Sequence, residues 1–472
     1  MRRILGPLKK YFLLTLIFAV VLLFLFQLKE GDSFWRKIKG TEVVTTNSNK
    51  PQPTIDIKPL KSSAITDVVS AREQSPEVYE IDEIDGSITD SPGTKSWYFK
   101  KGIKYPTVKP KEKRVLKLYQ AEDPHSDRII NQLMHVPPNY EEIQEAGKMK
   151  VIYVANGLGT WNVKRGRDEF LKSKCPVDMC SITAAREKAP SADLIMYKDR
   201  IIPLGLKRNP SQLHLLYMLE CPYHTPSFHT VDAINWTATY RKDSDIVAPY
   251  EKWQYYNPSI RQIEQDKNYA ANKTRKVAWF VSNCAARNNR LQYAQELQKH
   301  IDVDIYGFCG TFKCPRRNKK CFEILDRDYK FYLAFENSNC KDYITEKFYV
   351  NALSRNILPI VMGARPEDYE SGAPHKSYIH VDEFSSPKEL AEYLHILDKD
   401  DELYNSYFKW KGTGEFINTF FWCRICTMLH DESYLDNPKW YPDINSWWRG
   451  RGVCTNDSWR NYKARNDVIK DD

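Results

Sequence analysis

The stretch that most constrains the fold reads FYLAFENSNCKDYITEKFYVNAL and covers residues 331–353. Its first part, 331–335, is apolar and aromatic, which is typical of a strand buried inside a parallel sheet. Turn-forming residues follow at 337–339, and Asp342 can then accept hydrogen bonds from the free N–H groups of a first helical turn. The stretch therefore predicts a strand, a loop and a helix that begins after Asp342. Apolar residues recur along that helix at every fourth position: Ile344, Phe348 and Ala352.

Three side chains of the predicted helix carry polar chemistry. Tyr343, Glu346 and Lys347 stand at positions i, i+3 and i+4, so a helix would place them on one face. That face would lie at a helix N-terminus beyond the carboxyl end of a strand, which is where nucleotides bind in open α/β sheets. The spacing alone leaves a second interpretation open, in which this is an ordinary surface helix with its charges in solvent.

Strands alternate with helices on both sides of this stretch. The alternation predicts an α/β fold with two doubly wound, Rossmann-like domains that face each other across a cleft. The polar segment 266–274 lacks an apolar pattern and is the expected linker between them. The strand-like runs are 150–157, 192–198, 213–222, 356–364 and 377–384, and the segment 276–310 reads as strand, loop, helix and strand.

The N-terminal part predicts a membrane anchor. Residues 11–28 carry no charge, and a helix of this length rises roughly 27 Å, close to the thickness of a bilayer core. Basic residues within 1–10 predict a cytoplasmic tail by the positive-inside rule. A cleaved signal peptide is the alternative, but its apolar region is usually shorter and ends at small residues. Residues 29–114 are rich in polar residues and proline, so they are expected to form a stem without a core.

The charge and the cysteines narrow the class of protein. The formal net charge of +9 is spread along the chain without a basic block, so no nucleic-acid partner is expected. All 11 cysteines follow residue 170, in the part that the anchor would place in an oxidising lumen, where disulfides form. Cys423 and Cys426 read in isolation as a redox or zinc pair, but no second such motif completes a zinc site. Sequons for N-glycosylation fit the same compartment and lie at Asn235, Asn272 and Asn456.

Several blocks of the sequence resemble one family. The stretch 331–353 is very similar to the donor signature of the α1,3-fucosyltransferases, and the similarity continues in order over roughly residues 150–430. The resemblance implies a GT-B fold, GDP-fucose as the donor and inverting transfer of fucose to the 3-hydroxyl of N-acetylglucosamine in a glycan acceptor. It also implies a type II protein of the Golgi membrane with a lumenal catalytic domain. No cofactor is expected to be required, although stimulation by a divalent cation is compatible with this reading.

The resemblance also assigns residues to the donor site by motif. Arg290 and Lys347 can neutralise the pyrophosphate and stabilise charge on the departing GDP. The Glu346 carboxylate can accept hydrogen bonds from the ribose hydroxyls. The complete donor set is Arg290, Glu336, Asn337, Tyr343, Glu346 and Lys347.

An inverting transfer needs one general base on the acceptor side, and Glu220 in the block LECPYHTP is the candidate. It follows an apolar run, in a loop where function is commonly carried, and it matches the glutamate of the family's block. Cys221 departs from the family pattern, in which a different small residue is commoner. His224 and His229 lie nearby in the sequence and are interpreted as ordinary polar residues.

The sequence also bears on three other functions. The triplet Asp243-Ser-Asp245 resembles the metal-binding motif of another glycosyltransferase fold, but it is interpreted as structural, so no metal site is expected. A non-catalytic glycan-binding relative is the alternative from a different class, and the intact Glu220 and donor residues argue against it. A glycosidase would need two carboxylates that flank one bond, and no motif supplies that pair.

The resemblance finally suggests how the chain is divided and which acceptor it uses. It implies an acceptor-side domain over 115–265, a GDP-fucose-binding domain over 275–425 and a tail over 426–472 that packs back on the acceptor-side domain. The cysteine-rich segment 309–321 resembles that of members that fucosylate the inner N-glycan core, so the core chitobiose is the expected acceptor. Terminal N-acetyllactosamine or its N-acetylgalactosamine analogue is the alternative. The implied disulfides join the pair Cys423 and Cys426 to the pair Cys175 and Cys180.

Overall fold

The computed structural model describes residues 95–107, 116–207, 209–229, 232–315, 320–435 and 438–468. The chain divides into two compact units, residues 1–78 and 79–472, and the described residues all belong to the second. The predicted cytoplasmic tail, the anchor over 11–28 and most of the stem lie outside the described residues. Within the described ranges, no helix is both long and apolar enough to cross a membrane.

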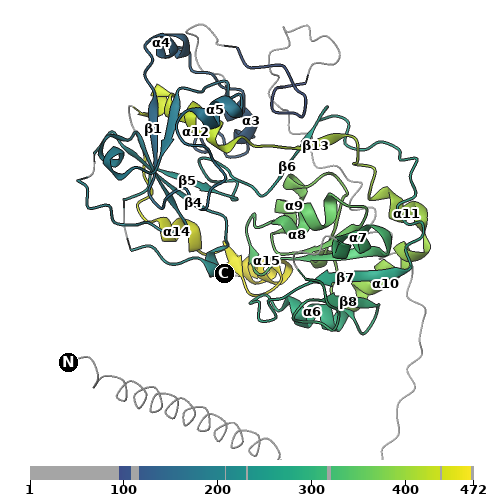
Figure 1. Cartoon of the computed structure of the whole chain (residues 1–472). Coiled ribbons are helices and arrows are strands. Elements are labelled where there is room, and N and C mark those ends of the chain that lie inside the picture. The colour runs from purple at the N-terminus through teal and green to yellow at the C-terminus, as the bar shows by residue number, and fades with distance from the viewer. Residues whose placement is uncertain are drawn as a thin grey trace, which may run out of the picture. The chain divides into compact units, whose positions relative to one another are not determined.

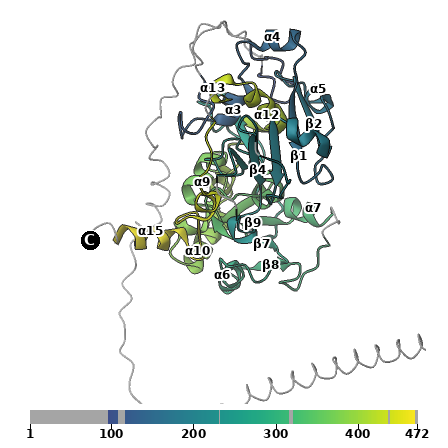
Figure 2. The same ribbon diagram turned by 90° about the vertical axis from the view of Figure 1, so that its left-hand side faces the viewer.

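The first half of the folded unit, which we call the N-lobe, is built on a parallel five-stranded sheet with the order β2-β1-β3-β4-β5. Helices from distant parts of the sequence cover it, and α12 lies beside α3 and α5 in both views (Figures 1 and 2). The strands are β1 (Lys150–Val154), β2 (Cys180–Thr183), β3 (Leu194–Lys198), β4 (Leu213–Met218) and β5 (Trp236–Thr239), and the helices are α3 (Arg128–Leu133), α4 (Tyr140–Glu145), α5 (Asp168–Lys172) and α12 (Phe421–Leu429).

The second half, the C-lobe, repeats the same plan. Its parallel sheet has the order β12-β11-β9-β7-β8. Read from the β8 edge, the strands follow the order second, first, third, fourth and fifth along the chain, as in the N-lobe. The predicted α/β class with two Rossmann-like domains is therefore confirmed. The strands are β7 (Arg275–Phe280), β8 (Val303–Tyr306), β9 (Tyr329–Phe335), β11 (Leu358–Met362) and β12 (Ile379–His380), and the helices are α6 (Arg290–Leu297), α7 (Lys320–Arg327), α9 (Pro366–Gly372), α10 (Pro387–Lys399) and α11 (Asp401–Ser406).

The strand predicted at 331–335 is the centre of the C-lobe sheet. In the structure it begins two residues earlier, and every residue of β9 is buried. It pairs in parallel with β7 on one side and β11 on the other, with Phe331 opposite Leu358 and Phe335 opposite Met362. A strand covered on both faces is apolar throughout, which explains the continuous run in the sequence.

The helix that follows is shorter than predicted, and its predicted cap is wrong. An α-helical turn, α8 (Glu346–Phe348), continues as a π-helical turn, η3 (Tyr349–Leu353), and the N-cap is Thr345, whose hydroxyl accepts from the N–H of Lys347. Asp342 stands outside the helix with a left-handed backbone, φ 59°. Its carboxylate accepts from the N–H of Lys242 in the N-lobe at 3.0 Å, so it joins the lobes rather than capping the helix.

The predicted stem extends too far toward the C-terminus. Trp97, Tyr98 and Phe99 are buried in the N-lobe core, and the Trp97 indole donates to the Leu133 carbonyl at 3.2 Å. Aromatic side chains bury large apolar areas, so these residues belong to the folded unit. A fragment that starts near residue 115 would lack them.

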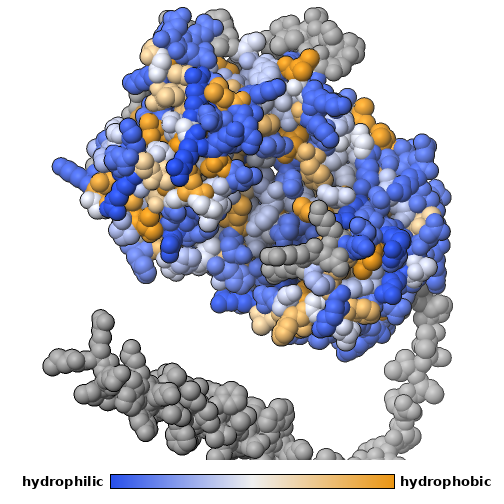
Figure 3. Space-filling model, viewed as in Figure 1, coloured by the Kyte–Doolittle hydropathy of each residue, from blue (hydrophilic) through white to orange (hydrophobic). Residues whose placement is uncertain are grey.

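The segment 266–274 is not a loose linker. Tyr269 is buried in the C-lobe core and stacks on Phe408 at 4.3 Å between ring centroids. The lobes are also joined by an antiparallel ribbon of β6 (Lys252–Tyr255) and β13 (Gly414–Ile417). On the face shown in Figure 3, hydrophobic residues are scattered among hydrophilic ones on both lobes.

The C-terminal tail does not pack on the acceptor-side domain alone. The helix α14 (Ile444–Arg449) contributes Ile444 and Trp448 to an N-lobe core. Beyond it, β14 (Cys454–Thr455) pairs with β10 (Asn339–Cys340), and α15 (Trp459–Val468) lies against the C-lobe (Figure 1). The prediction for 426–472 is therefore wrong after about residue 450, because the chain crosses back to the donor side. The remaining elements are α13 (Glu432–Leu435), η1 (Arg186–Ser191), η2 (Pro222–His224) and η4 (Val381–Glu383).

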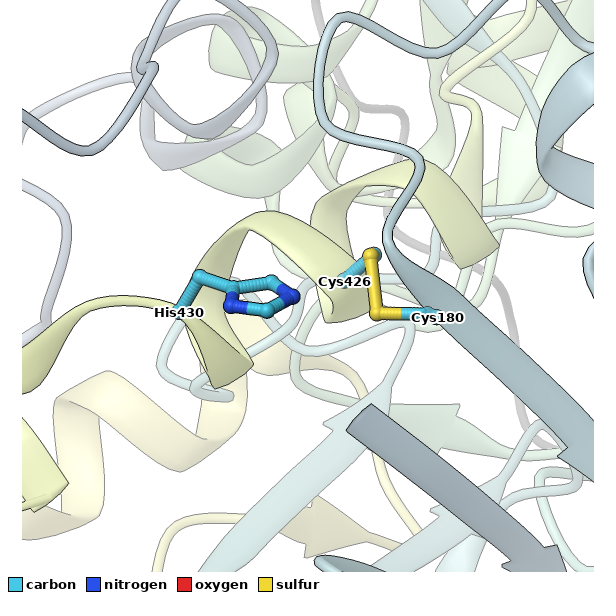
Figure 4. Close-up of side chains that lie close together, drawn as sticks. All are labelled: Cys180, Cys426 and His430. Carbon is cyan, nitrogen blue, oxygen red and sulfur yellow. A yellow bond between two sulfur atoms is a disulfide. The ribbon is translucent and has the colours of Figure 1, made fainter. Parts of the chain in front are cut away.

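The predicted disulfides between the pair Cys175 and Cys180 and the pair Cys423 and Cys426 are present. Cys175 bonds to Cys423 and Cys180 to Cys426, which ties α12 to the N-lobe sheet. Because these sulfur atoms are bonded to one another, they are not available as thiolate ligands, although His430 lies beside the second bridge (Figure 4). The zinc reading of Cys423 and Cys426 is therefore excluded. The other disulfides are Cys284–Cys309, Cys314–Cys321 and Cys340–Cys454, and Cys221 is free.

Candidate active site

Glu220 lies at the carboxyl end of β4, where the chain turns into η2. The strand is held inside the sheet by β3 and β5, so its end is a fixed point of the N-lobe. The side chain of Glu220 is 44% exposed. A carboxylate that stands on a rigid strand end and reaches solvent can receive a proton from a bound ligand.

The hydrogen bonds of Glu220 all fall on one of its two oxygens. Its Oε1 accepts from the Tyr343 hydroxyl at 2.7 Å, from the Cys221 N–H at 2.9 Å and from the Asn337 amide at 3.5 Å. Its Oε2 accepts no hydrogen bond within the described part of the chain. Burial raises the pKa of Glu220, but these three hydrogen bonds outweigh it and hold the pKa below its usual range. The carboxylate is therefore ionised and keeps one oxygen open.

Tyr343 reaches Glu220 from the other lobe. Its ring is buried, and its hydroxyl is a proton donor because burial and the charges of Glu336 and Glu220 raise the pKa of Tyr343 far above its ordinary value. Since a neutral phenol favours the charged form of a carboxylate that it donates to, the C-lobe helps to set the ionisation of an N-lobe group.

Glu336 lies immediately after β9 and is fully buried. Its Oε1 accepts from the backbone N–H of Thr345, and both of its oxygens accept from the Thr345 hydroxyl, at 2.8 and 2.9 Å. Its Oε2 also accepts from the Lys347 ammonium at 2.9 Å. A side chain at Gly363, whose φ is +151°, would lie 2.6 Å from Glu336, so only glycine fits there. Glu336 thus fixes the start of α8 and positions Lys347.

The two charged residues of α8 lie nearer to solvent. The Lys347 ammonium also contacts the Glu346 carboxylate at 3.4 Å, and Glu346 is 52% exposed. Burial lowers the pKa of Lys347, but the charges of Glu336 and Glu346 outweigh it and raise this pKa above its usual range. Lys347 therefore carries a permanent positive charge beside a fully buried carboxylate.

Arg290, the first residue of α6, is more enclosed than the sequence suggested. It is 4% exposed, and its guanidinium donates to the backbone carbonyls of Phe335 at 2.7 Å and Asn283 at 3.2 Å. Its Nε has no partner among the described residues. Arg290 thus supports the loops at the ends of β7 and β9, where the strand order of the C-lobe reverses. This switch point is where ligands bind in open α/β sheets.

The structure gathers the predicted residues into two groups rather than on one helix face. Asn337 and Tyr343 contact Glu220 across the lobes. The second group contains Arg290, Glu336, Glu346 and Lys347 at the carboxyl edge of the C-lobe sheet. The predicted face shared by Tyr343, Glu346 and Lys347 is wrong, because Tyr343 precedes the helix and its side chain points to Glu220.

Sequence reasoning missed two residues that build the site and did not foresee the contact of Cys221. Thr345 holds Glu336, and its place directly before Glu346 is a recognisable N-cap signal. Tyr250 donates to the Leu219 carbonyl at 3.0 Å and so fixes the residue before Glu220, but no local pattern identifies it. The free thiol of Cys221 lies 3.2 Å from the Ser338 hydroxyl of the C-lobe, which is an ordinary polar contact of a buried cysteine.

Asp243 and Asp245 have structural partners. Asp243 pairs with Arg241 at 2.5 Å and with Lys341 at 3.0 Å. Asp245 accepts from the Thr237 N–H at 2.8 Å and from the Tyr441 hydroxyl at 2.9 Å. Both carboxylates are therefore engaged away from Glu220. Of the two histidines, His224 lies 3.7 Å from Glu220, and His229 is exposed.

One of the three sequons is wrong as a glycosylation site. Asn235 is 3% exposed, and its amide nitrogen donates to the Lys439 carbonyl at 3.0 Å, so a glycan has no room there. Asn272 and Asn456 are exposed and stay candidate sites.

Two family models and several curated proteins match this sequence. Residues 148–251 match the family model "Fucosyltransferase, N-terminal", and residues 270–447 match "Glycosyltransferase family 10 (fucosyltransferase) C-term". The chain is 58% identical to glycoprotein 3-alpha-L-fucosyltransferase A of Drosophila melanogaster, over 100% of this chain and 99% of that protein. It is 32% identical to alpha-(1,3)-fucosyltransferase fut-6 of Caenorhabditis elegans, over 70% of this chain and 88% of that protein. A solved α1,3-fucosyltransferase with GDP-fucose is similar with a TM-score of 0.40 and 16% identity, over 63% of this chain and 93% of that one.

Proposed function

Because the chain belongs to the glycosyltransferase family 10 fucosyltransferases and is an α1,3-fucosyltransferase, we propose that it fucosylates the 3-hydroxyl of an N-acetylglucosamine residue in the N-glycan core chitobiose. GDP-β-L-fucose is the donor, and the transfer proceeds with inversion. The name of the Drosophila relative, a glycoprotein 3-alpha-L-fucosyltransferase, supports a glycoprotein acceptor. The short disulfide loop of Cys314 and Cys321 supports the core-type assignment.

The geometry around Glu220 supports the inverting transfer in this proposal. Since Oε1 is held by Tyr343 and Oε2 is open, Oε2 accepts the proton of the acceptor 3-hydroxyl as that oxygen attacks the anomeric carbon of fucose. The new bond forms on one face of the sugar while the bond to GDP breaks on the other, which inverts the configuration. The proton stays on Glu220 until solvent removes it, and the electron pair of the broken bond leaves on GDP.

The C-lobe group receives the donor in this proposal. The ammonium of Lys347, which forms an ion pair with the buried Glu336, supplies a fixed positive charge for the diphosphate. The exposed carboxylate of Glu346 accepts hydrogen bonds from the ribose hydroxyls. Arg290 positions the loops at the ends of β7 and β9 and adds its charge to the same edge. No cofactor is required, because these cations stabilise the leaving group.

The arrangement of the whole protein follows from the same assignment. We infer a GT-B enzyme whose acceptor and donor lobes close on the two substrates. Residues 11–28 anchor it as a type II protein in the Golgi membrane, with the folded unit in the lumen. The disulfides and the exposed sequons at Asn272 and Asn456 support a lumenal position.

Analysis of the product glycans tests the acceptor. The purified enzyme is incubated with GDP-fucose and a glycopeptide, and the product is treated with a glycosidase that core α1,3-fucose blocks. We expect resistance to this enzyme, with GDP released in equal amount. A product that stays sensitive, together with fucose on terminal N-acetyllactosamine, would replace the core assignment by the terminal one. Binding of glycan without release of GDP would contradict the enzymatic reading.

A further inference from the structure

A cluster of half-buried aromatic side chains lies on the N-lobe, and the mechanism above does not use it. We call Trp161, Tyr217, Phe421 and Trp422 the aromatic platform. The Trp161 ring lies 4.7 Å from the Tyr217 ring and 5.3 Å from the Trp422 ring, and Phe421 lies 5.4 Å from Tyr217. All four side chains pack against the N-lobe core on one side and are partly exposed.

The platform stands at the same edge of the sheet as Glu220. Trp161 follows β1, Lys198 ends β3 with its ammonium 4.7 Å from the Trp161 ring, and Tyr217 is near the end of β4, three residues before Glu220. The strand order reverses between β1 and β3, so Trp161 and Lys198 flank the switch point of the N-lobe. Open α/β sheets bind ligands outside the carboxyl ends of their strands at such a point.

The platform offers one unused polar group beside its rings, the Tyr217 hydroxyl. The Tyr217 hydroxyl makes no hydrogen bond within the described part of the chain, and burial raises its pKa, so it remains a neutral donor. The indole N–H of Trp161 also lacks a partner among the described residues, but it is buried and faces the protein interior. Aromatic surface with a few hydrogen-bonding groups is typical of ligand sites. A pyranose fits this chemistry, because one face of its ring presents C–H groups to an aromatic ring while its hydroxyls bond to polar neighbours.

A cavity lies between the segment that precedes α12 and the segment around Tyr250. It has a volume of about 330 Å³ and is lined by residues 249–251 and 416–419. Residues 416–419 lead directly into α12, which begins at Phe421. Among the lining residues, Tyr250 donates to the Leu219 carbonyl, next to Glu220, and Glu251 contributes a carboxylate. Its two lining segments are therefore connected to the platform, through α12, and to the residue before Glu220, through Tyr250.

We propose that the aromatic platform binds a pyranose ring of the acceptor glycan that neighbours the N-acetylglucosamine receiving fucose. The proposal rests on the proposed function, since it needs Glu220 to act on a glycan. It extends that function by naming a subsite for a second sugar, in which Trp161 stacks on the ring and the Tyr217 hydroxyl binds one of its hydroxyls. The subsite makes the enzyme prefer extended acceptors over a single sugar.

The test compares two acceptors in each variant of the full active protein. One is a glycopeptide with an extended N-glycan, and the other is a simple glycoside of N-acetylglucosamine. We expect Trp161→Leu, which keeps apolar volume but removes the ring, to lower the ratio of kcat/KM for the extended acceptor to that for the glycoside about tenfold. Tyr217→Phe removes one hydroxyl and should lower the same ratio about threefold.

Trp440→Ala is the matched control. Trp440 is 46% exposed, and the neighbouring Lys439 carbonyl accepts from Asn235, which precedes β5, so Trp440 lies near the opposite edge of the sheet. In Trp440→Ala, the ratio of kcat/KM for the extended acceptor to that for the glycoside should equal the wild-type ratio. A ratio that is unchanged in both Trp161→Leu and Tyr217→Phe would overturn the subsite, as would an equal loss for both acceptors with weakened GDP binding. If the wild type acts on terminal rather than core N-acetylglucosamine, the core assignment fails, while the same ratio measured on terminal glycans still decides the subsite.

Discussion

The two halves of the active site are built in different ways. On the donor side, Glu336 is fully buried and is held by Thr345 and Lys347, which follow it by 9 and 11 residues. On the acceptor side, Glu220 is 44% exposed, and its strongest partner, Tyr343, lies 123 residues away in the other lobe. A single stretch of sequence thus preorganises the donor half, whereas the acceptor half is complete only when the two lobes meet.

Removing Glu336 should break the donor half most severely. Glu336→Ala leaves Lys347 without its buried counter-ion, and loss of one partner of a buried pair costs about 3–5 kcal/mol. We expect a large fall in the unfolding temperature and loss of GDP binding, measured by thermal denaturation and calorimetry. Glu392→Gln, on the exposed face of α10, should change neither. A variant Glu336→Ala with wild-type stability would show that the donor half is not preorganised by this carboxylate.

Lys347→Ala should weaken donor binding with a smaller effect on the fold. A charge-assisted hydrogen bond to the diphosphate is worth about 1.5–3 kcal/mol, so the affinity for GDP should fall about 10- to 150-fold in a calorimetric titration. Lys388→Ala, an exposed residue of α10 in the same lobe, is the control and should bind GDP like the wild type. Unchanged GDP affinity in Lys347→Ala would move this residue out of the donor site.

Tyr343→Phe should break the link between the halves and keep the ring in place. The hydrogen bond to Glu220 lowers the pKa of that carboxylate, so its loss raises this pKa and moves the acid limb of the pH–rate profile to higher pH. On the acid side, kcat/KM should fall about tenfold relative to the wild type, because the lost hydrogen bond to a charged group is worth about 1.5 kcal/mol. A lower rate with an unshifted limb would mean that Tyr343 acts on the donor alone.

A chelator should have the smallest effect. Asp243 is paired with Arg241 and Lys341, and Asp245 accepts from Thr237 and Tyr441, so neither is expected to hold a catalytic metal. Activity in EDTA should stay within about twofold of the untreated enzyme, which allows for modest stimulation by a divalent cation. Complete loss that manganese restores would contradict this and return Asp243 and Asp245 to the active site.

The contrast between the locally built donor half and the acceptor half that needs both lobes also explains what the sequence could predict. The strand at 331–335 and the proximity of Glu336 to Lys347 follow from apolar runs and short spacings, which act locally. The left-handed backbone of Asp342, by contrast, accompanies a hydrogen bond that its carboxylate accepts from Lys242 in the other lobe. Once Asp342 leaves the helix, Tyr343 turns toward Glu220, and no pattern within this stretch reports that contact.

Local patterns also failed to predict which residues are buried. The sequon at Asn235 looks like any other in the sequence, but the structure covers it with the segment around Lys439, 204 residues later. Trp97 stands in a polar region and yet enters the N-lobe core through contacts with Leu133. In each case, a partner distant in the sequence decides the environment of the residue.

The most direct test of the account is the pH–rate profile of Glu220→Gln. Glutamine keeps the shape of the side chain and can still accept from Tyr343, but it cannot take a proton. We expect kcat to fall about a hundredfold or more, with the acid limb of the wild-type profile missing and GDP binding unchanged. Near-normal kcat with only a raised KM for the acceptor would contradict the central claim, because Glu220 would then bind the acceptor without removing its proton.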